Sequence, residues 1–527
     1  MNAPDTDQQK QEPTAKKRGI LGSGLLVSAM TFLSRIMGLV RDIVIATLIG
    51  AGGAADAFFV AFKIPNFLRR LFAEGAFNQA FIPVLAEYAE TKSRAEVKRL
   101  NNAVAGCLGL SLVALSSLAV LAAPLLVWVF APGFASDPEK QAVTVDLLRI
   151  TFPYLLLISL TAFAGSILNT YNRFAIPAFT PVLLNVSLIA SAIFLSSWAG
   201  SSAEALAWGV LIAGIVQLAF QLPFLAREGL LPVPIPDWKH SGVRRILKLM
   251  APALFGVSVS QINLLLDTLL ASFLTDGSVG WLYYADRLVE LPLGVFGIAI
   301  ATVILPTLSR QHATADKEKF SQLLDWAVRM VLLIGLPAAL ALVLLAEPLL
   351  ITLFQYGAMT ALDVEMSALA LRAYALGLLA FMLIKVLAPG YFARQNTRTP
   401  VRIGIKAMAA NMVFNLILIV PLAHAGLALA TAASAFLNAG MLARGLRKEG
   451  ILQWMPGWGR FALQICFALL LMVGLLLWLS PATSVWLEWG ITERVLRLAL
   501  LVLLGGGLYG LALLAAGVRF QQLKPSS

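Results

Sequence analysis

Residues 32–42 of the chain read FLSRIMGLVRD, and residues 55–88 read ADAFFVAFKIPNFLRRLFAEGAFNQAFIPVLAEY. Each stretch predicts a long apolar helix that carries charges where a membrane helix normally has none. These charged residues include Arg35, Arg41, Lys63, Arg69, Arg70 and Glu74. An arginine at the bilayer centre costs about 2.5–3.5 kcal/mol on insertion scales, and it almost always faces a protein interior or a watery cavity. The sequence therefore predicts a chamber lined with arginines, which would attract an anion.

The composition indicates a polytopic membrane protein. Of the 527 residues, 59% are hydrophobic and 13% are charged, whereas a soluble protein has about 25% charged residues. A membrane helix needs about 20 apolar residues, and about 14 stretches of the chain qualify. We therefore predict an all-α fold with these spans: 21–49, 55–88, 101–130, 141–172, 176–198, 203–226, 245–274, 279–309, 322–356, 362–395, 400–423, 426–445, 459–480 and 492–518.

The charges in the loops predict the orientation of these spans. Every second loop is rich in Lys and Arg, including the long one from Arg227 to Lys248, whereas the loops between them carry mainly Asp and Glu. Arg494 and Arg497, near the outer end of the last span, are the exceptions. Positive charge concentrates on the cytoplasmic side of membrane proteins. We therefore expect both termini of this multi-pass protein in the cytoplasm.

Short motifs recur at an offset of 223 residues, which indicates an internal repeat. The matched positions are Pro83 and Pro306, Arg149 and Arg372, and Pro177 and Pro400. The offset covers six predicted spans, an even number, so the two halves should be related by a pseudo-two-fold axis along the membrane normal. Parallel repeats of this kind occur in transporters that rock two lobes around a central site.

The repeat predicts the domain organisation. We expect a disordered cytoplasmic tail over residues 1–18 and an N-lobe with spans 1–6 over residues 19–242. A C-lobe with spans 7–12 should cover residues 243–448, and a helix pair with spans 13 and 14 should cover residues 449–527.

The two lobes are expected to differ in charge. Arg35 and Arg41 have no counterpart in the second lobe, whose first span reads FGVSVSQINLLLD. A guanidinium group binds phosphate oxygens bidentately, so several of them suit a diphosphate. A second interpretation stays open for Arg70 with Glu74, and for Asp286 with Glu290, because such groups also form internal ion pairs that hold helices together.

Other kinds of partner are not expected. The net charge of +12 comes mostly from short loops beside the spans, so it does not indicate a nucleic-acid-binding module. The two cysteines and three histidines are scattered along the chain and lack the spacing of metal sites. We expect no cofactor and no metal.

Four segments resemble the MurJ (MviN) family, the lipid II flippases of bacterial peptidoglycan synthesis within the multidrug/oligosaccharidyl-lipid/polysaccharide exporter superfamily. They are SRIMGLVRD at 34–42, the stretch at 55–88, YYADRLVELPLGVFGIAIATVILPTLS at 283–309 and LAPGYFARQNTRTPV at 387–401. The resemblance implies a transporter of the bacterial inner membrane and not an enzyme. Its substrate would be lipid II, an undecaprenyl-diphosphate-linked disaccharide-pentapeptide, which a monomer surrounded by membrane lipids would flip to the periplasmic leaflet by alternating access.

The resemblance also implies roles for individual residues. The substrate-binding arginines of the family match Arg35, Arg41, Arg69 and Arg287. The outer-side acid matches Asp56, and a gating ion pair matches Arg69 and Glu74. We add Arg70, Asp286 and Glu290 to the gating or charge-coupling group because of their positions in the same spans. The last two helices would form a groove for the polyprenyl tail.

Three alternatives remain at this point. A flippase for another polyprenyl-linked sugar would use the same chemistry. A multidrug or cation antiporter of the same superfamily would need unpaired acids in a neutral or acidic cavity, which the excess of arginine disfavours. A membrane-embedded glycosyltransferase or phosphatase would need a paired acid and base or a metal cluster, for which Asp286 with Glu290 is a weak candidate.

Overall fold

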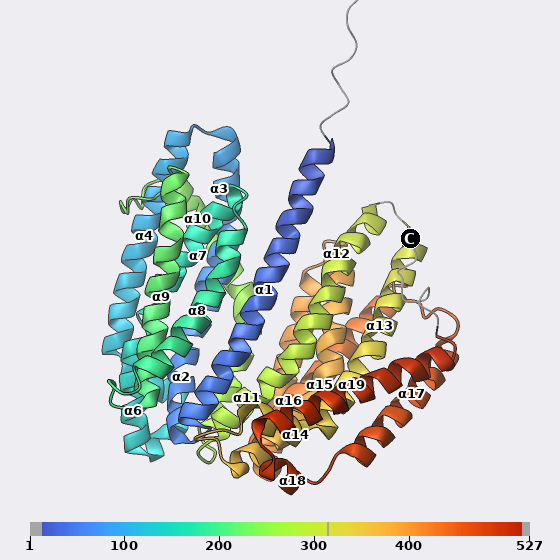
Figure 1. Ribbon diagram of the computed structural model, residues 1–527. Coiled ribbons are helices and arrows are strands. Elements are labelled where there is room, and N and C mark those ends of the chain that lie inside the picture. The colour runs from blue at the N-terminus through green and yellow to red at the C-terminus, as the bar shows by residue number, and fades with distance from the viewer. Residues whose placement is uncertain (1–12, 314–315, 519–527) are drawn as a thin grey trace, which may run out of the picture. The chain divides into compact units, whose positions relative to one another are not determined.

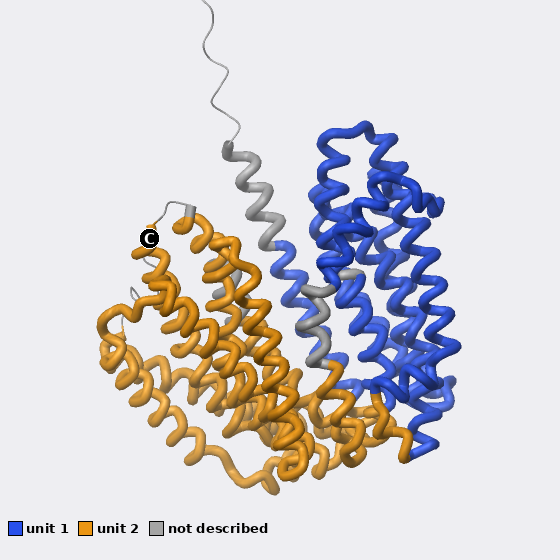
Figure 2. Tube along the Cα trace, turned by 180° about the vertical axis from the view of Figure 1, so that it is seen from behind, with its two compact units in different colours: residues 1–45, 57–130, 137–261 blue, residues 46–56, 131–136, 262–527 orange. Residues whose placement is uncertain are grey.

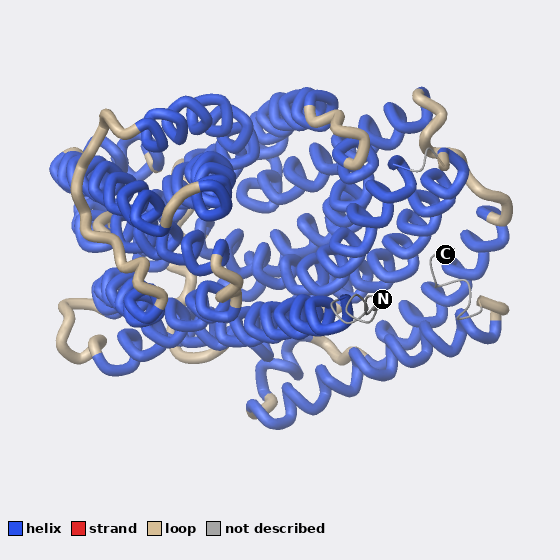
Figure 3. Tube along the Cα trace, turned by 90° about the horizontal axis from the view of Figure 1, so that it is seen from above, coloured by secondary structure: helices blue, strands red, loops and turns tan. Residues whose placement is uncertain are grey.

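The computed structural model describes residues 13–313 and 316–518, without the side chains of residues 13–25, 73–74, 255–264, 296–303 and 313. Within these residues the chain is helical and contains no β-strand (Figures 1 and 3). Nine of the described helical segments are long and apolar enough to cross a membrane. These observations confirm the predicted all-α, polytopic fold.

The chain divides into two compact units (Figure 2). Unit 1 comprises residues 1–45, 57–130 and 137–261, and unit 2 comprises residues 46–56, 131–136 and 262–527. The helices that lie wholly or mainly in unit 1 are α1 (Pro13–Ile49), α2 (Gly53–Leu68), η1 (Arg69–Phe77), α3 (Asn78–Thr91), α4 (Arg94–Leu121), α5 (Ala123–Phe130), α6 (Pro138–Thr151), α7 (Tyr154–Thr170), α8 (Ala175–Phe194), α9 (Ser202–Arg227) and α10 (Ser241–Ala271).

Unit 2 holds the second half of the chain together with two short segments from the first half. Its helices are η2 (Pro132–Ser136), α11 (Ser278–Pro292), η3 (Leu293–Gly297), α12 (Ile298–Ala313), α13 (Lys317–Leu344), α14 (Ala346–Phe354), α15 (Ala361–Phe392), α16 (Arg398–Lys448), α17 (Trp458–Leu479), α18 (Thr483–Glu488) and α19 (Ile491–Ala515). Residues 46–56 also belong to this unit; they comprise the end of α1, the connecting turn and the start of α2, and we call them the α1–α2 turn. The division into the predicted lobes and helix pair stays a prediction.

In unit 1, α7 packs against α4, α8 and α9. Three phenylalanines fill the core beside α7: the ring of Phe81 lies 5.1 Å from the rings of both Phe77 and Phe163. Residues that enter the bilayer must satisfy their backbone groups within the protein. Some of the described helices also begin with a side-chain cap: at the start of α4, Ser93 and Glu96 form reciprocal hydrogen bonds.

The segment from residue 228 to residue 240, which we call the linker, is extended and docks on α4. The backbone N–H of Val233 donates to Asn102 Oδ1 (2.8 Å), and that of Ile235 donates to the carbonyl of Asn102 (3.2 Å). One turn further along α4, a Cβ on Gly106 would lie only 2.3 Å from the linker backbone at Ile235. The absence of a side chain at Gly106 is therefore what lets the linker lie this close.

In unit 2, α15 packs against α11, α13 and α16, and α17 packs against α19. Helix α16 covers the two predicted spans 400–423 and 426–445, but its backbone breaks at Ala423, where φ is 47° and ψ is −129°. Pro421 stands two residues before the break, and proline cannot supply the N–H that continues a helix. The break therefore falls at the last residue of the first of these two predicted spans.

Two of the long spans contain a π-helical segment that the sequence did not reveal. Segment η1 interrupts the predicted span 55–88, and η3 interrupts the predicted span 279–309. Arg69 opens η1, and the position 223 residues later is Pro292, immediately before η3. The two π-helical segments thus begin 224 residues apart, within one residue of the repeat offset. Single π turns inside helices are frequent at functional sites.

Candidate functional site

The four predicted substrate-binding arginines differ in their surroundings, and Arg35 stands apart. Its side chain is half-buried in α1. Among the residues that the structure describes, none forms a hydrogen bond or an ion pair with it. An uncompensated guanidinium group in an apolar helix is costly. Arg35 is therefore the described cation of this helix whose charge is most available to an anion.

Arg41 is held by neighbours within unit 1. Its Nη2 and Nε atoms lie 2.6 and 2.9 Å from Oδ1 of Asp42, and its Nη1 donates to Asn185 Oδ1 on α8 (3.0 Å). The amide of Asn185 in turn donates to the backbone carbonyl of Ser34 (3.1 Å). Arg41 is only 5% exposed. Asn185 therefore ties the part of α1 that carries both arginines to α8.

Arg69 and Arg70 open the π-helical segment η1. Arg69 Nε donates to Asn66 Oδ1 (2.8 Å), and Arg70 is exposed. The side chain of Glu74 lies outside the described residues, so its predicted pairing is not tested. In an α-helix, residues three or four apart are neighbours, whereas the wider π turn, with i→i+5 hydrogen bonds, also brings residues five apart together. The backbone thus places position 74 within one turn of both arginines.

Asp56 caps the amino-terminal end of α11 in unit 2. Its two carboxylate oxygens accept hydrogen bonds from the backbone N–H groups of Gly277 (2.8 Å) and Gly280 (2.9 Å), and the residue is 1% exposed. The hydroxyl of Tyr284, also on α11, donates to the carbonyl of Gly50 (2.8 Å). A carboxylate at a helix amino terminus is stabilised by the free N–H groups and by the helix dipole. Asp56 therefore anchors the α1–α2 turn to α11.

The close approach of that turn depends on small residues. A Cβ on Gly280 would lie 3.0 Å from the carbonyl oxygen of Ala51. Gly277 has φ of +97°, which an L side chain rarely adopts. The backbone N–H of Ala358 also donates to the carbonyl of Thr47 (2.9 Å). Several hydrogen bonds thus hold a single turn of the chain in place.

The three charged residues predicted on α11 lie within one turn. Arg287 Nη1 pairs with Glu290 Oε2 at 2.7 Å, and the guanidinium group lies 5.7 Å from the centre of the Tyr283 ring. The side chain of Arg287 is 31% exposed and that of Glu290 is 47% exposed; Asp286 is exposed as well. The charge of Arg287 is therefore partly offset, in contrast to that of Arg35.

Asp267 ends the FGVSVSQINLLLD run quoted above, and the sequence did not predict the side chains that hold it. Asn415 Nδ2 donates to Asp267 Oδ1 (2.9 Å) and Thr431 Oγ1 donates to Asp267 Oδ2 (3.2 Å). Asn411 accepts from Asn415 (3.1 Å), and both asparagines are fully buried. The sequence did offer one signal for these contacts: two asparagines stand four residues apart in an apolar run. Among the described residues, no cluster of three or more His, Cys, Asp or Glu side chains could hold a metal.

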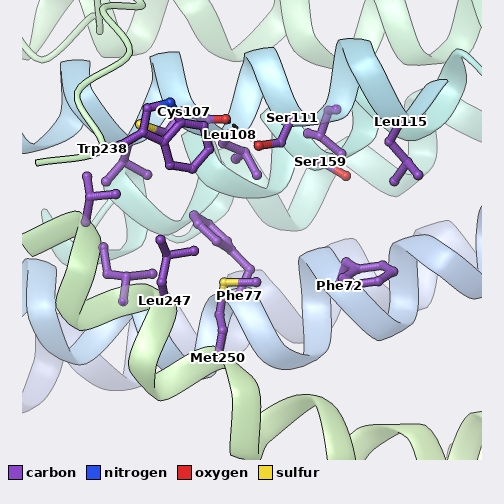
Figure 4. A pocket seen from close by; sticks show the side chains of 14 residues that line it. Phe72, Phe77, Cys107, Leu108, Ser111, Leu115, Ser159, Trp238, Leu247 and Met250 are labelled. Carbon is purple, nitrogen blue, oxygen red and sulfur yellow. Dashed lines mark hydrogen bonds between the residues drawn. The ribbon is translucent and has the colours of Figure 1, made fainter. Parts of the chain in front are cut away.

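An apolar pocket of about 250 Å³ lies within unit 1 (Figure 4). Phe72, Phe77, Cys107 and Met250 line it, and Trp238 of the linker forms part of its wall. No charged residue contributes to its lining. Its lining therefore offers a diphosphate no ionic partner.

The predicted chamber remains a prediction, because its arginines are divided between the units. Arg35, Arg41 and Arg69 belong to unit 1 and Arg287 belongs to unit 2. The structure shows the surroundings of each residue within its own unit. Arg35 has no described partner, the other three arginines have polar neighbours, and Asp56 caps a helix.

Comparison with known proteins gives a consistent answer. Residues 45–500 match the family described as lipid II flippase MurJ. The chain is 49% identical to the probable lipid II flippase MurJ of Vibrio cholerae, over 98% of this chain and 99% of the relative. It is 44% identical to the lipid II flippase MurJ of Burkholderia cenocepacia, over 86% and 89% of the two chains.

Solved structures agree with the sequence relatives. A lipid II flippase MurJ in an inward closed conformation superposes with a TM-score of 0.76 at 29% identity, covering 93% of this chain and 100% of that one. An inward-facing multidrug transporter of the MATE family superposes with a TM-score of 0.63 at 16% identity, covering 81% and 98%; at that identity the likeness shows the fold alone. The resemblance found in the sequence is thereby confirmed, and the chain belongs to the lipid II flippase MurJ family.

Proposed function

We propose that this protein transfers lipid II from the cytoplasmic to the periplasmic leaflet of the bacterial inner membrane by alternating access, without a covalent step. The observation that carries the proposal is its identity of 49% with a probable lipid II flippase over nearly the whole of both chains. The undecaprenyl chain would stay in the lipid phase while the polar headgroup crosses between the lobes.

In this proposal Arg35 makes the first ionic contact with the diphosphate. Its half-buried guanidinium group has no partner among the described residues, so binding an anion removes a cost that the empty protein bears. Arg41, Arg69 and Arg287 would complete the anion site. Each of these has a polar neighbour at 2.6–2.8 Å, so each must exchange that neighbour for a phosphate oxygen.

Asp56 would control the outer side of the protein. Its two hydrogen bonds to α11 and the bond from Tyr284 to Gly50 hold the α1–α2 turn in place. Opening toward the periplasm would require these bonds to break. Arg70, Glu74, Asp286 and Glu290 would couple occupancy of the anion site to this movement, because they are the charged groups nearest in sequence to Arg69 and Arg287.

The experiment that tests the function measures headgroup exposure in cells depleted of their own lipid II flippase. Cells that express this protein should expose newly made lipid II on the outer face, and cells without it should accumulate lipid II on the cytoplasmic face. Arg35→Ala should resemble the depleted cells, and Arg173→Ala provides a control because Arg173 is a surface residue paired with Glu228. If cells with the Arg35→Ala variant exposed as much lipid II as cells with the unchanged protein, Arg35 would not be part of the anion site.

A flippase for another polyprenyl-linked sugar would give a different result in this experiment. Such a protein would expose its own substrate on the outer face but would leave lipid II on the cytoplasmic face in the same cells. The depletion experiment therefore separates the two substrates by which headgroup becomes accessible.

A further inference from the structure

A cationic pocket that shares no residue with the predicted chamber lies where α16 ends. An open pocket of about 550 Å³ in unit 2 is lined by Arg444, Arg447 and Lys448 of α16 and by Trp454 of the following loop. The three cations are spaced so that they share one face of the helix. All three side chains are exposed.

These three cations lack acidic partners within the described part of the chain. Neither Arg444 nor Lys448 has an ion pair or side-chain hydrogen bond there, and Arg447 contacts only the Trp454 ring, 5.9 Å from its centre. Glu449, the adjacent acid, forms an ion pair with Arg394 at 2.7 Å. By contrast, Arg329, Arg372 and Arg497 of the same unit each pair with a carboxylate. The pocket therefore carries a positive charge that the described residues do not neutralise.

The aromatic residues around the pocket place it at a membrane surface. The rings of Trp454 and Trp458 lie 5.0 Å apart, and Trp458 begins α17, the next membrane helix. Tryptophan concentrates at the level of lipid headgroups. Arg329 lies 5.0 Å from the Trp458 ring and donates to the carbonyls of Met455 and Pro456, which fixes the loop that carries Trp454. One wall of the pocket is thus held in place.

A phosphodiester group fits this arrangement. Arginine binds phosphate oxygens with two parallel hydrogen bonds, and lysine adds a point charge. Basic pockets between membrane helices on the cytoplasmic side bind lipid headgroups, at about 1 kcal/mol per cation. We propose that Arg444, Arg447, Lys448 and Trp454 form a binding site for the headgroup of an anionic phospholipid. This proposal does not rest on the proposed function.

The test measures lipid binding by the full-length protein. Native mass spectrometry in detergent would follow the retention of added phosphatidylglycerol, with phosphatidylcholine as the zwitterionic comparison. Each cation should contribute about fivefold in affinity, the equivalent of about 1 kcal/mol. We expect the triple variant Arg444→Gln, Arg447→Gln, Lys448→Gln to bind phosphatidylglycerol about a hundredfold more weakly, and Lys448→Gln alone about fivefold more weakly.

The matched control is Arg497→Gln. Arg497 also lies over a tryptophan, 5.2 Å from the ring of Trp489, but it pairs with Glu493. Its removal should leave phosphatidylglycerol binding unchanged. The single Lys448→Gln variant keeps the test valid if the triple variant unfolds.

Three outcomes would overturn the proposal. They are wild-type retention of phosphatidylglycerol by the charge-removal variants, equal binding of phosphatidylcholine, and displacement by inorganic phosphate at the same concentration as the lipid. The last result would assign the pocket to free anions in place of a membrane lipid. Because the readout is lipid binding and not flipping, a negative result leaves the proposed function untouched.

Discussion

Replacing Asp56 by asparagine should loosen the α1–α2 turn, because the carboxylate uses both oxygens in the contact with α11. It accepts from the N–H groups of Gly277 and Gly280 at 2.8 and 2.9 Å in a site where it is 1% exposed. Asparagine retains one acceptor oxygen but presents an NH₂ group to the other donor. It also loses the negative charge at the helix amino terminus.

The magnitude follows from these two losses. A hydrogen bond to a charged group contributes about 1.5–3 kcal/mol, and a charge at a helix terminus contributes about 0.3–1 kcal/mol. Losing one such bond and the charge should therefore weaken the contact by about 2–4 kcal/mol. At about 1.4 kcal/mol for each factor of ten, the open form of the turn should become at least about thirtyfold more populated.

A cysteine at position 278 would report this opening. Ser278 lies in the first turn of α11 with 0% exposure, and serine to cysteine changes only one atom. Under the proposed function, α11 begins on the periplasmic side. In a background with Cys107→Ser and Cys466→Ser, Ser278→Cys should then react slowly with a membrane-impermeant maleimide added outside. The Asp56→Asn change should raise the reaction rate at least about thirtyfold.

The control is Asp316→Asn, which removes another aspartate cap in unit 2, where Asp316 Oδ1 accepts from the N–H of Lys319 (3.0 Å). It should leave the reaction of Ser278→Cys unchanged, because Asp316 caps α13 and not α11. An unaltered labelling rate in Asp56→Asn would refute the assignment of Asp56 as the residue that holds the turn.

Three further predictions concern charge and packing. Arg35→Ala should reduce headgroup exposure at least tenfold without lowering the melting temperature of the purified protein, because no described partner is lost; a fall in melting temperature would indicate a structural role instead. Exchanging Arg69 and Glu74 for each other should retain more flipping activity than either single change if they pair directly, and equal loss in all three variants would exclude the pair. Gly106→Ala should make the linker several times more sensitive to trypsin, since its Cβ would lie 2.3 Å from the linker backbone. Gly109→Ala, which meets no atom within 4 Å, should have no such effect, and equal sensitivity in the two variants would contradict the packing argument.

The fold could be predicted because membrane helices are specified locally. Apolar runs of sufficient length mark the spans, and Pro421 stands just before the break that ends one of them. The π-helical segments could not be predicted, because an inserted residue changes no composition and leaves the hydrophobic run intact. Arg69, a proposed site residue, opens η1. The π-helical backbone, which was not predicted, therefore determines which residues lie within one turn of Arg69.

The partners of the charged residues were harder to predict than the charges themselves. Arg41 pairs with the adjacent Asp42, whereas the helical spacing rule considers residues three or four apart; the long side chain of arginine folds back to reach its neighbour. Asn185 and Asn415 contact residues more than a hundred positions away. Such contacts depend on which helices pack against one another, and this cannot be predicted from a single sequence.

The unequal pairing of the arginines bears on how a flippase could release its substrate. A site built only from unpaired cations would bind a diphosphate tightly in every conformation, and a ligand that binds two states equally shifts no equilibrium between them. Arg41 and Arg287 keep acids at 2.6 and 2.7 Å, which can reclaim them when the phosphate leaves. Under the proposed function, Arg35 would therefore supply attraction in all states, and the paired arginines would supply the difference in affinity that drives the cycle. Arg287→Lys should then slow release less than Glu290→Gln, because only the second change removes the competing acid.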